Sequence, residues 1–313
     1  MQLSLWRSIC RFLLLQALVL LLIAPLPGLA EERVSVLYPD VSPPYSLVFE
    51  KIIDGIRSER AFSLNLIPLG AEFSKEELQQ QVTVNGTQAI IALGRRGRQA
   101  ATELQNNLPT VLGAVPLVPQ NATGISLSAN PEQLFATLKA IAPETRTVSV
   151  VYSPTANAWL LPFAEQAAER QQLQLKSFPV KDLREAMLRY REILNGVDSR
   201  TEALWLPLDH ISSDDDVVLP LLLREAWKKD LIIFSSKPTD AQRGALFSMY
   251  PDNFGHGREL AALLTRRLAT PLVPTALPAE DLLLAVNLRT AAHLGINFTT
   301  QQQQHFDLTF PSR

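Results

Sequence analysis

The chain has 313 residues, a formal net charge of −2 and a single cysteine. A slightly negative net charge does not predict the basic surface that nucleic-acid binding requires. A single thiol cannot form an intramolecular disulfide. Hydrophobic residues make up 47% of the sequence, which is enough for a large core held by packing alone.

The first thirty residues have the pattern of an export signal. Arg7 and Arg11 precede an apolar run over residues 12–24, which is short for a membrane span of roughly 20 residues. Gly28 and Ala30 then place small residues at the −3 and −1 positions of a cleavage site. We therefore predict a cleavable signal peptide over residues 1–30, with an uncleaved N-terminal anchor as the alternative.

Cleavage at this point would change the composition of the working protein. It removes Cys10 and two of the 29 basic residues, so that 27 basic and 31 acidic residues remain and the formal net charge becomes −4. The mature chain of 283 residues would contain no cysteine and could carry neither a disulfide nor a lipid on a cysteine. We expect a mature protein that is exported and is not anchored in the membrane.

Beyond the signal, short apolar runs alternate with longer amphipathic ones. The apolar runs have the length of buried strands, and the amphipathic runs have the periodicity of helices. Strands are predicted over Val34–Tyr38, Leu64–Ile67, Ala89–Leu93, Thr110–Ala114, Val148–Tyr152, Ala203–Leu206, Leu231–Phe234 and Leu246–Met249. Helices are predicted over Leu47–Arg57 and near residues 160–171, 182–195, 216–229 and 256–268. A further helix should begin at Asn130, with Pro131 in its first position and Gln133 completing a capping box.

This alternation predicts an α/β protein with parallel sheets covered by helices on both faces. The chain has more strand–helix units than one ordinary sheet contains, so we expect two doubly wound parallel-sheet lobes joined by a hinge. The polar and proline-containing stretches near residues 116–121, 235–239 and 271–278 are the expected crossings. The first lobe would then contain residues 31–118 and 237–270, and the second residues 119–236 and 271–313.

The sequence lacks the common catalytic and metal-binding motifs. It has no HExxH, GxSxG or P-loop, and no GxGxxG follows its first strand. Its four histidines have no partners at metal-ligand spacing, and Asp214–Asp216 are acidic residues that favour the start of a helix. We therefore predict a protein that is not an enzyme and holds neither a cofactor nor a metal.

Parallel sheets bind ligands beyond the carboxyl ends of their strands. The loops at these ends are rich in hydroxyl, amide, carboxylate and aromatic side chains, which suits a small polar ligand between two lobes. The candidate ligand-binding residues are Asp40, Ser42, Tyr45, Gly94, Arg95, Arg96, Tyr152, Ser153, Thr155, Asn157, Asp209, Tyr250 and Asp252. Asp209 and Asp252 could instead cap helices, and Arg95 and Arg96 could be solvated charges. If either arginine faces the ligand, an anionic ligand is expected.

Several segments together resemble a known family. They are Thr123–Leu127, Leu134–Pro143, Val148–Pro154, Gly244–Ser248 followed by Asp252, Phe254 and Gly257, and Asn287 followed by Ala291–Ile296. This pattern is similar to the tryptophan/tyrosine-type ABC transporter substrate-binding family, and the likeness implies the type I periplasmic binding protein fold. Arg95, Arg96 and Gly97 depart from it, because the family has a small hydroxyl residue and an alanine in this turn.

The resemblance implies a periplasmic, monomeric protein that closes on a small polar or anionic, amino-acid-like solute and presents it to the membrane permease of an ABC transporter. A sensor that hands its ligand-bound state to a membrane receptor kinase would use the same fold and is the first alternative. An exported hydrolase that uses carboxylates such as Asp209 and Asp252 is the second.

Overall fold

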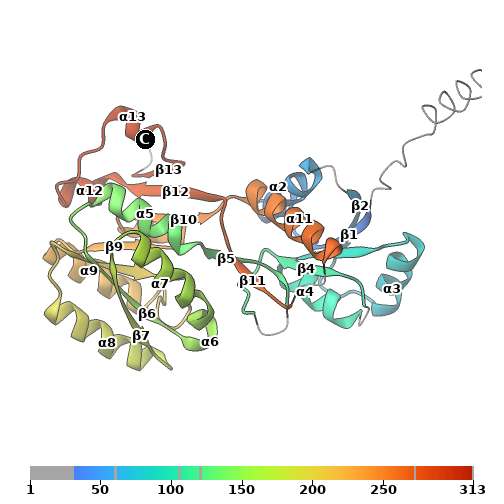
Figure 1. Cartoon of the computed structure of the whole chain (residues 1–313), viewed down its shortest axis with the longest axis horizontal. Helices are drawn as coiled ribbons and strands as arrows, with labels where there is room; N and C mark the ends of the chain where they lie inside the picture. Colours follow the sequence, from blue (N-terminus) through green and yellow to red (C-terminus); the bar gives the residue numbers. More distant parts are fainter. Residues whose placement is uncertain (1–31, 60–61, 105–106, 120–121, 271–272, 312–313) are drawn as a thin grey trace, which may run out of the picture. The chain divides into compact units, whose positions relative to one another are not determined.

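The computed structural model describes residues 32–59, 62–104, 107–119, 122–270 and 273–311. The predicted signal peptide therefore lies outside the described residues. Strands and helices alternate along the chain and form two sheets, one of six strands and one of seven (Figure 1). The predicted α/β architecture is confirmed.

The first sheet has the strand order β11-β5-β4-β3-β1-β2. Its strands are β1 (Glu32–Pro39), β2 (Phe62–Leu69), β3 (Ala89–Leu93), β4 (Thr110–Gly113), β5 (Gly124–Ala129) and β11 (Ala276–Ala279). The helices that accompany it are α2 (Tyr45–Ser58), α3 (Lys75–Val84), α4 (Gly94–Glu103) and α11 (Asn253–Ala269). The pairings β1–β3, β3–β4, β4–β5 and β5–β11 are all parallel.

The second sheet has the order β13-β12-β10-β9-β8-β6-β7. Its strands are β6 (Thr147–Tyr152), β7 (Gln174–Pro179), β8 (Glu202–Leu206), β9 (Ile232–Ser235), β10 (Phe247–Pro251), β12 (Leu282–Asn287) and β13 (Leu308–Phe310). Its helical segments are α5 (Pro131–Ile141), α6 (Pro154–Asn157), the 3₁₀ turn Ala158–Leu160, α7 (Leu161–Arg170), α8 (Leu183–Gly196), α9 (Val218–Lys229), α10 (Pro238–Arg243), α12 (Leu288–His293) and α13 (Thr300–Gln303). Among the described strands of this sheet, only the pairing of β12 with β10 is antiparallel, and β13 runs parallel to β12.

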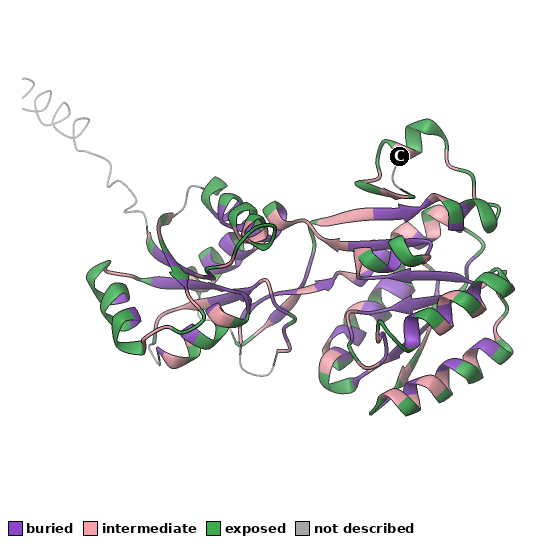
Figure 2. Cartoon of the chain, turned by 180° about the vertical axis from the view of Figure 1, so that it is seen from behind, coloured by how far each residue is buried: buried purple, intermediate pink, exposed green. Residues whose placement is uncertain are grey.

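Central strands are buried on both faces, as parallel sheets require. Every residue of β3 is buried, and Ile91 and Leu93 pack into a different core cluster from Ile90 and Ala92. In the second sheet Trp205 packs edge-on against Phe135 of α5, with ring centroids 5.5 Å apart. Figure 2 shows the strands mostly buried and the outer helix faces exposed.

Helices α2 and α11 lie side by side over one face of the first sheet (Figure 1). Two glycines permit this close approach. A Cβ atom on Gly257 of α11 would overlap the carbonyl oxygen of Ile52 in α2, and one on Gly55 of α2 would overlap that of Phe254 in α11. This contact places α11 against the first sheet, at the point where the chain has just left the second sheet.

The chain passes between the sheets further along the sequence than expected. Strand β5 pairs with β4 and β11 in the first sheet, and α10 and β10 belong to the second. The passages therefore fall near residues 130, 252 and 280–281, rather than at the three polar or proline-containing stretches. Those stretches connect elements of the same lobe. The division of the chain into lobes stays a prediction. The strand pairing favours boundaries near residues 130, 252 and 280–281 over the predicted ones.

The three crossings are hydrogen-bonded to one another. The Asn130 N–H donates to the Ala279 carbonyl at 2.9 Å, and the Asp252 N–H donates to the Asp281 carbonyl at 2.8 Å. The Glu259 carboxylate of α11 accepts the N–H groups of Glu280 and Asp281 at 3.0 and 2.6 Å. A short network of backbone bonds thus joins the segments between the sheets.

The start of α5 differs from the prediction in one respect. Asn130 caps the helix by accepting the Glu132 N–H at 3.0 Å, and Pro131 occupies the first turn, as expected. Gln133 does not complete a capping box, because the Asn130 N–H is already bound to Ala279. The Gln133 amide donates to the carbonyl of Glu280 instead.

Candidate functional site

Six of the predicted residues lie at the carboxyl edge of the first sheet. Asp40, Ser42 and Tyr45 follow β1, while Gly94, Arg95 and Arg96 begin α4 directly after β3. Because β1 and β3 are neighbours in the sheet, both groups come to the same edge. The three residues after β1 are exposed, and Tyr45 is 71% accessible.

The two arginines of this edge differ in their surroundings. Arg96 Nη1 donates to the carbonyl of Asp40 at 3.1 Å and to that of Leu69 at 3.4 Å, so it ties together the ends of β1 and β2. Arg95 is exposed at the first turn of α4. Gly94 has φ +71°, and a Cβ atom there would lie 3.0 Å from the Pro39 side chain, which accounts for glycine at this turn.

At the carboxyl edge of the second sheet, Asp209 organises the loops after β6 and β8. One carboxylate oxygen accepts the Ser153 N–H at 2.7 Å and the Asn157 amide at 2.9 Å. The other accepts the N–H groups of Ile211 and Ser212 at 2.8 and 3.1 Å. Four donors therefore hold a carboxylate that is only 4% exposed.

These contacts determine the charge of Asp209. Burial acts to raise its pKa, but the hydrogen bonds from Ser153, Ser212, Ile211 and Asn157 outweigh burial and leave the pKa below its ordinary value. Asp209 is therefore ionised at neutral pH. Its oxygens are occupied by the protein, so its function in the site is to position the two loops.

A cavity of about 540 Å³ lies next to Asp209. Its walls come from the loops after β6 and β8, from the connection between β4 and β5, and from Lys237 after β9. Ser213 also lines it, and the Ser213 carbonyl accepts a hydrogen bond from Lys237. A cavity with a few polar groups in a wall that is already held in place is typical of sites for small polar ligands.

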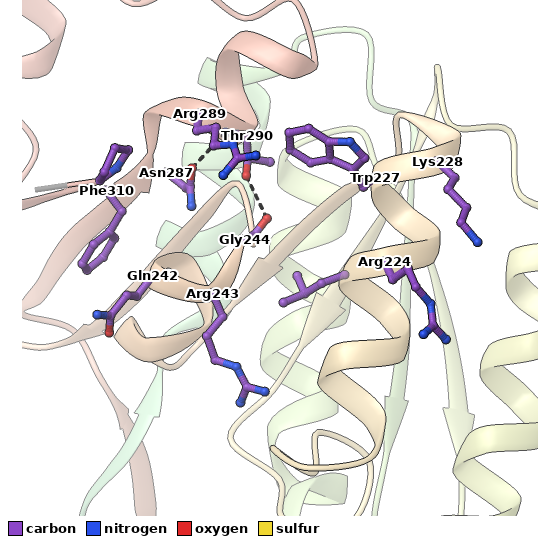
Figure 3. Close-up of a pocket in the computed structure, with 12 residues that line it drawn as sticks. Arg224, Trp227, Lys228, Gln242, Arg243, Gly244, Asn287, Arg289, Thr290 and Phe310 are labelled. Carbon is purple, nitrogen blue, oxygen red and sulfur yellow. Dashed lines mark hydrogen bonds between the residues drawn. The ribbon is translucent and has the colours of Figure 1, made fainter.

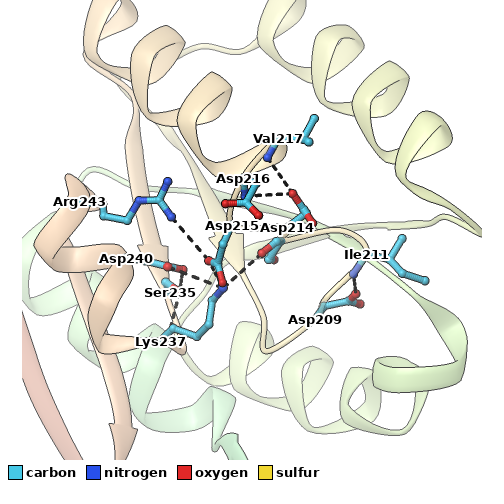
Figure 4. Close-up of polar contacts among 11 residues, drawn as sticks. Asp209, Ile211, Asp214, Asp215, Asp216, Val217, Ser235, Lys237, Asp240 and Arg243 are labelled. Carbon is cyan, nitrogen blue, oxygen red and sulfur yellow. Dashed lines mark hydrogen bonds and ion pairs between the residues drawn. The ribbon is translucent and has the colours of Figure 1, made fainter.

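Acidic side chains and one lysine line this cavity, and Figure 4 draws the polar contacts among them. Lys237 Nζ lies 2.7 Å from Asp215 and 3.2 Å from the Ser213 carbonyl, while Asp214 accepts the N–H groups of Asp216 and Val217. Asp214 therefore caps the turn before α9, as the sequence indicated, and Asp216 contributes a further acidic side chain to the wall.

Behind Lys237 lies a fully buried carboxyl group. Asp240 accepts a hydrogen bond from the Ser235 hydroxyl, and its other oxygen is 3.8 Å from Lys237 Nζ. Burial raises the pKa of Asp240, against the lowering effects of Ser235 and Lys237. Arg243 also approaches Asp215, at 3.8 Å, and completes the network drawn in Figure 4.

Of the predicted ligand-binding residues, Asp209 alone lines this cavity, although its neighbours Ser153 and Asn157 hold the wall in place. Tyr152 ends β6 and Thr155 lies in α6, directly beside this wall in the sequence. Sequence reasoning missed Ser213 and Lys237. Lys237 follows the carboxyl end of β9, so the strand-end rule would have included it.

The remaining two predicted residues lie at the second crossing. Asp252 caps α11 by accepting the Gly255 N–H at 2.8 Å, which is the alternative that the sequence left open for it. Tyr250 is partly buried in β10, and burial raises its pKa, helped by Asp307 and Asp252. Ligand contact by either residue stays a prediction.

Two features that would indicate another class of function are absent from the described residues. No group of three or more histidine, cysteine, aspartate or glutamate side chains in this part of the chain could hold a metal ion. Within the same residues, no helix is both long enough and apolar enough to cross a membrane.

Residues 74–303, well over half of the chain, match the family model of the ABC transporter substrate binding protein. The chain belongs to this family. The resemblance inferred from its sequence segments is thereby confirmed. The family consists of binding proteins, so the protein is the substrate-binding component of an ABC transporter and not an enzyme such as an exported hydrolase. It binds a small molecule and works with a permease.

Solved structures share the fold. A domain from Streptococcus pneumoniae in complex with L-Trp is 17% identical with a TM-score of 0.52, and the match covers 90% of this chain and 100% of that one. A conserved domain protein from Vibrio cholerae is 20% identical with a TM-score of 0.51, covering 89% and 99%. A ligand-free, open substrate-binding protein with adhesive properties from Clostridium difficile is 13% identical with a TM-score of 0.59, covering 90% and 100%. No curated protein matches the chain in sequence. These likenesses confirm the type I periplasmic binding protein fold.

Proposed function

We propose that this substrate-binding protein carries a small, amino-acid-like zwitterion in the cavity beside Asp209. The observation that carries the proposal is a cavity whose loops are already held in place and whose wall combines carboxylates with a lysine. A preformed site with few polar groups aimed into it is typical of small-molecule binding.

The charges around the cavity support a zwitterion over a simple anion. Asp214 and Asp216 offer carboxylates to an ammonium group, and Lys237 offers a cation to a carboxylate. The anionic alternative rested on Arg95 and Arg96, and Arg96 is engaged with two backbone carbonyls. The L-Trp bound to the Streptococcus pneumoniae domain is a zwitterion of this class.

Binding would be coupled to closure about the crossings near residues 130, 252 and 280–281. The closed form would then be recognised by the permease, because ligand shifts the population toward it. We further propose that the protein acts in the periplasm after cleavage of residues 1–30. N-terminal sequencing of the exported protein should begin at Glu31, and an intact Met1 would contradict this.

The test compares two lysines. Lys237→Gln removes the cation of the cavity, while Lys229→Gln removes the charge of an exposed lysine of α9. Calorimetry with a panel of the common amino acids first identifies a ligand. We then expect Lys237→Gln to raise its Kd about tenfold, as the loss of one charge-assisted hydrogen bond does, and Lys229→Gln to leave it unchanged.

Two outcomes would contradict the proposal. Equal affinity of both variants would mean that Lys237 does not contact the ligand. If no amino acid binds while a simple organic anion does, the zwitterion is excluded. The anionic ligand in contact with Arg95 would then be favoured.

A further inference from the structure

A second cavity, of about 680 Å³, lies elsewhere in the second lobe, between α9, α10, α12 and the end of β13 (Figure 3). It shares no lining residue with the cavity beside Asp209. Gly244 precedes β10, and Asn287 ends the antiparallel β12, so this cavity lies at the edge where β10 begins. The predicted solute site lies at the edge where β6, β8 and β9 end.

Hydrogen bonds hold the floor of this second cavity in place. The Asn287 amide donates to the Ala241 carbonyl at 2.8 Å and accepts the Thr290 N–H at 2.9 Å. The Thr290 hydroxyl donates to the Gly244 carbonyl at 3.0 Å. Helix α12 is thereby fixed against the end of α10, and the cavity exists without a ligand.

The lining of this cavity carries positive charge and no carboxylate. Its cationic residues are Arg224, Lys228, Arg243 and Arg289. The first three have acidic neighbours, since Glu225 pairs with Arg224 and Lys228, and Asp215 lies 3.8 Å from Arg243. Among the described residues, no carboxylate pairs with Arg289.

Aromatic groups position Arg289 at the cavity. Its guanidinium lies over the Trp227 ring, 5.6 Å from the centroid, and Figure 3 shows the two side by side while Lys228 points away. Trp227 in turn stacks on His293, with centroids 3.6 Å apart and planes 6° from parallel. His293 is held by Asp230 at 3.0 Å and by the Trp227 carbonyl at 2.9 Å. An arginine supported by a ring presents its planar set of donors to a carboxylate.

The same cavity exposes apolar surface. Trp227 is 41% accessible although its ring is stacked, and Leu223 and Phe310 add further apolar walls. A volume of this size is typical of sites for small molecules.

We propose that this cavity is a second binding site, for a small aromatic carboxylate. The carboxylate pairs with Arg289, and the ring of the ligand rests against Trp227, Leu223 and Phe310. This cavity is separate from the proposed solute site beside Asp209, so an experiment that refutes one proposal leaves the other standing.

Fluorine NMR of the protein labelled with 5-fluorotryptophan tests this site directly. The described residues contain three tryptophans, Trp159, Trp205 and Trp227, and a Trp227→Phe variant assigns the relevant resonance. Benzoate is the probe. We expect it to move the Trp227 resonance saturably at concentrations up to about 20 mM, the range of weak millimolar binding, and to leave the buried Trp205 unmoved. Sodium chloride at equal ionic strength should not reproduce the shift.

Substitutions of Arg289 test its part in binding. Arg289→Gln should weaken benzoate about tenfold, and Arg289→Lys, which keeps the charge without the fork, should weaken it less. Arg184→Gln, on the exposed face of α8, is the control for loss of one surface charge and should have no effect.

Three results would overturn the proposal. They are a Trp227 resonance that does not move, a shift that chloride reproduces, and equal benzoate affinity of the wild type and Arg289→Gln. Movement of Trp159 alone would also overturn it, because Trp159 donates to Ala156 at the wall of the other cavity.

Discussion

His256 of α11 should make the protein less stable as the pH falls below neutrality. The side chain is fully buried, and its Nε2 accepts the N–H of Ala114 at 3.0 Å. The ring is therefore neutral with its proton on Nδ1, which has no partner among the described residues. Burial lowers the pKa of His256 from 6.5 to about 4.

The sign of the effect follows from the two pKa values. Between pH 6.5 and 4 the unfolded chain binds a proton at His256 that the folded chain does not, so acid favours unfolding. Each pH unit in this window costs about 1.4 kcal/mol at most, and the whole shift corresponds to about 3 kcal/mol of unfolding free energy. Above pH 6.5 the residue makes no contribution to the pH dependence.

Urea denaturation of the wild type and of His256→Gln between pH 7.5 and 4.5 measures this contribution. Glutamine can accept the Ala114 N–H but does not titrate, so its stability should fall less in acid than that of the wild type. From pH 7.5 to pH 4.5 the unfolding free energy of the wild type should fall by about 2 kcal/mol more than that of His256→Gln. Parallel curves for the two proteins, or an NMR titration of the His256 ring with a pKa near 6.5, would refute the reasoning.

Two further predictions concern α11. Gly257→Ala should lower the unfolding free energy by about 2 kcal/mol or more, because its Cβ would overlap the Ile52 carbonyl, whereas Gly196→Ala, with open space around it, should be neutral or slightly stabilising in the same chemical denaturation. Burial raises the pKa of Glu259 to about 7, despite the backbone hydrogen bonds that lower it. The folded state therefore retains this proton above the unfolded pKa, and this contribution to stability should decrease as the pH rises from about 4.5 through 7. Glu259→Gln should remove that decrease, and a wild-type profile that the substitution leaves unchanged would contradict the assignment.

The secondary structure of the central strands could be predicted from the sequence because burial on both faces leaves a continuous apolar run. Ala89–Leu93 was predicted with the bounds that β3 has, and the run at Val148–Tyr152 was placed to within one residue. The rule that ligands bind beyond strand ends also led to Asp209 without any knowledge of its contacts. Local pattern and topology were sufficient for these inferences.

The crossings depended on partners far away in the sequence. Nothing near Asn130 shows that its N–H donates to Ala279, yet this bond places β5 in the first sheet and removes the predicted capping box. The proline-containing stretches resemble domain boundaries in composition, but strand pairing decides to which sheet a segment belongs.

The amino-acid sequence alone therefore determined the α/β class and the family, because these follow from local periodicity and motif order. The tertiary structure decided which side chains are available to a ligand. It occupied all the acceptor positions of Asp209 with protein donors, used Arg96 to join two strands, and brought Lys237 beside Asp215 at the wall of a cavity. Hydrogen-bond saturation depends on the positions of atoms from distant segments, and a sequence pattern does not contain it.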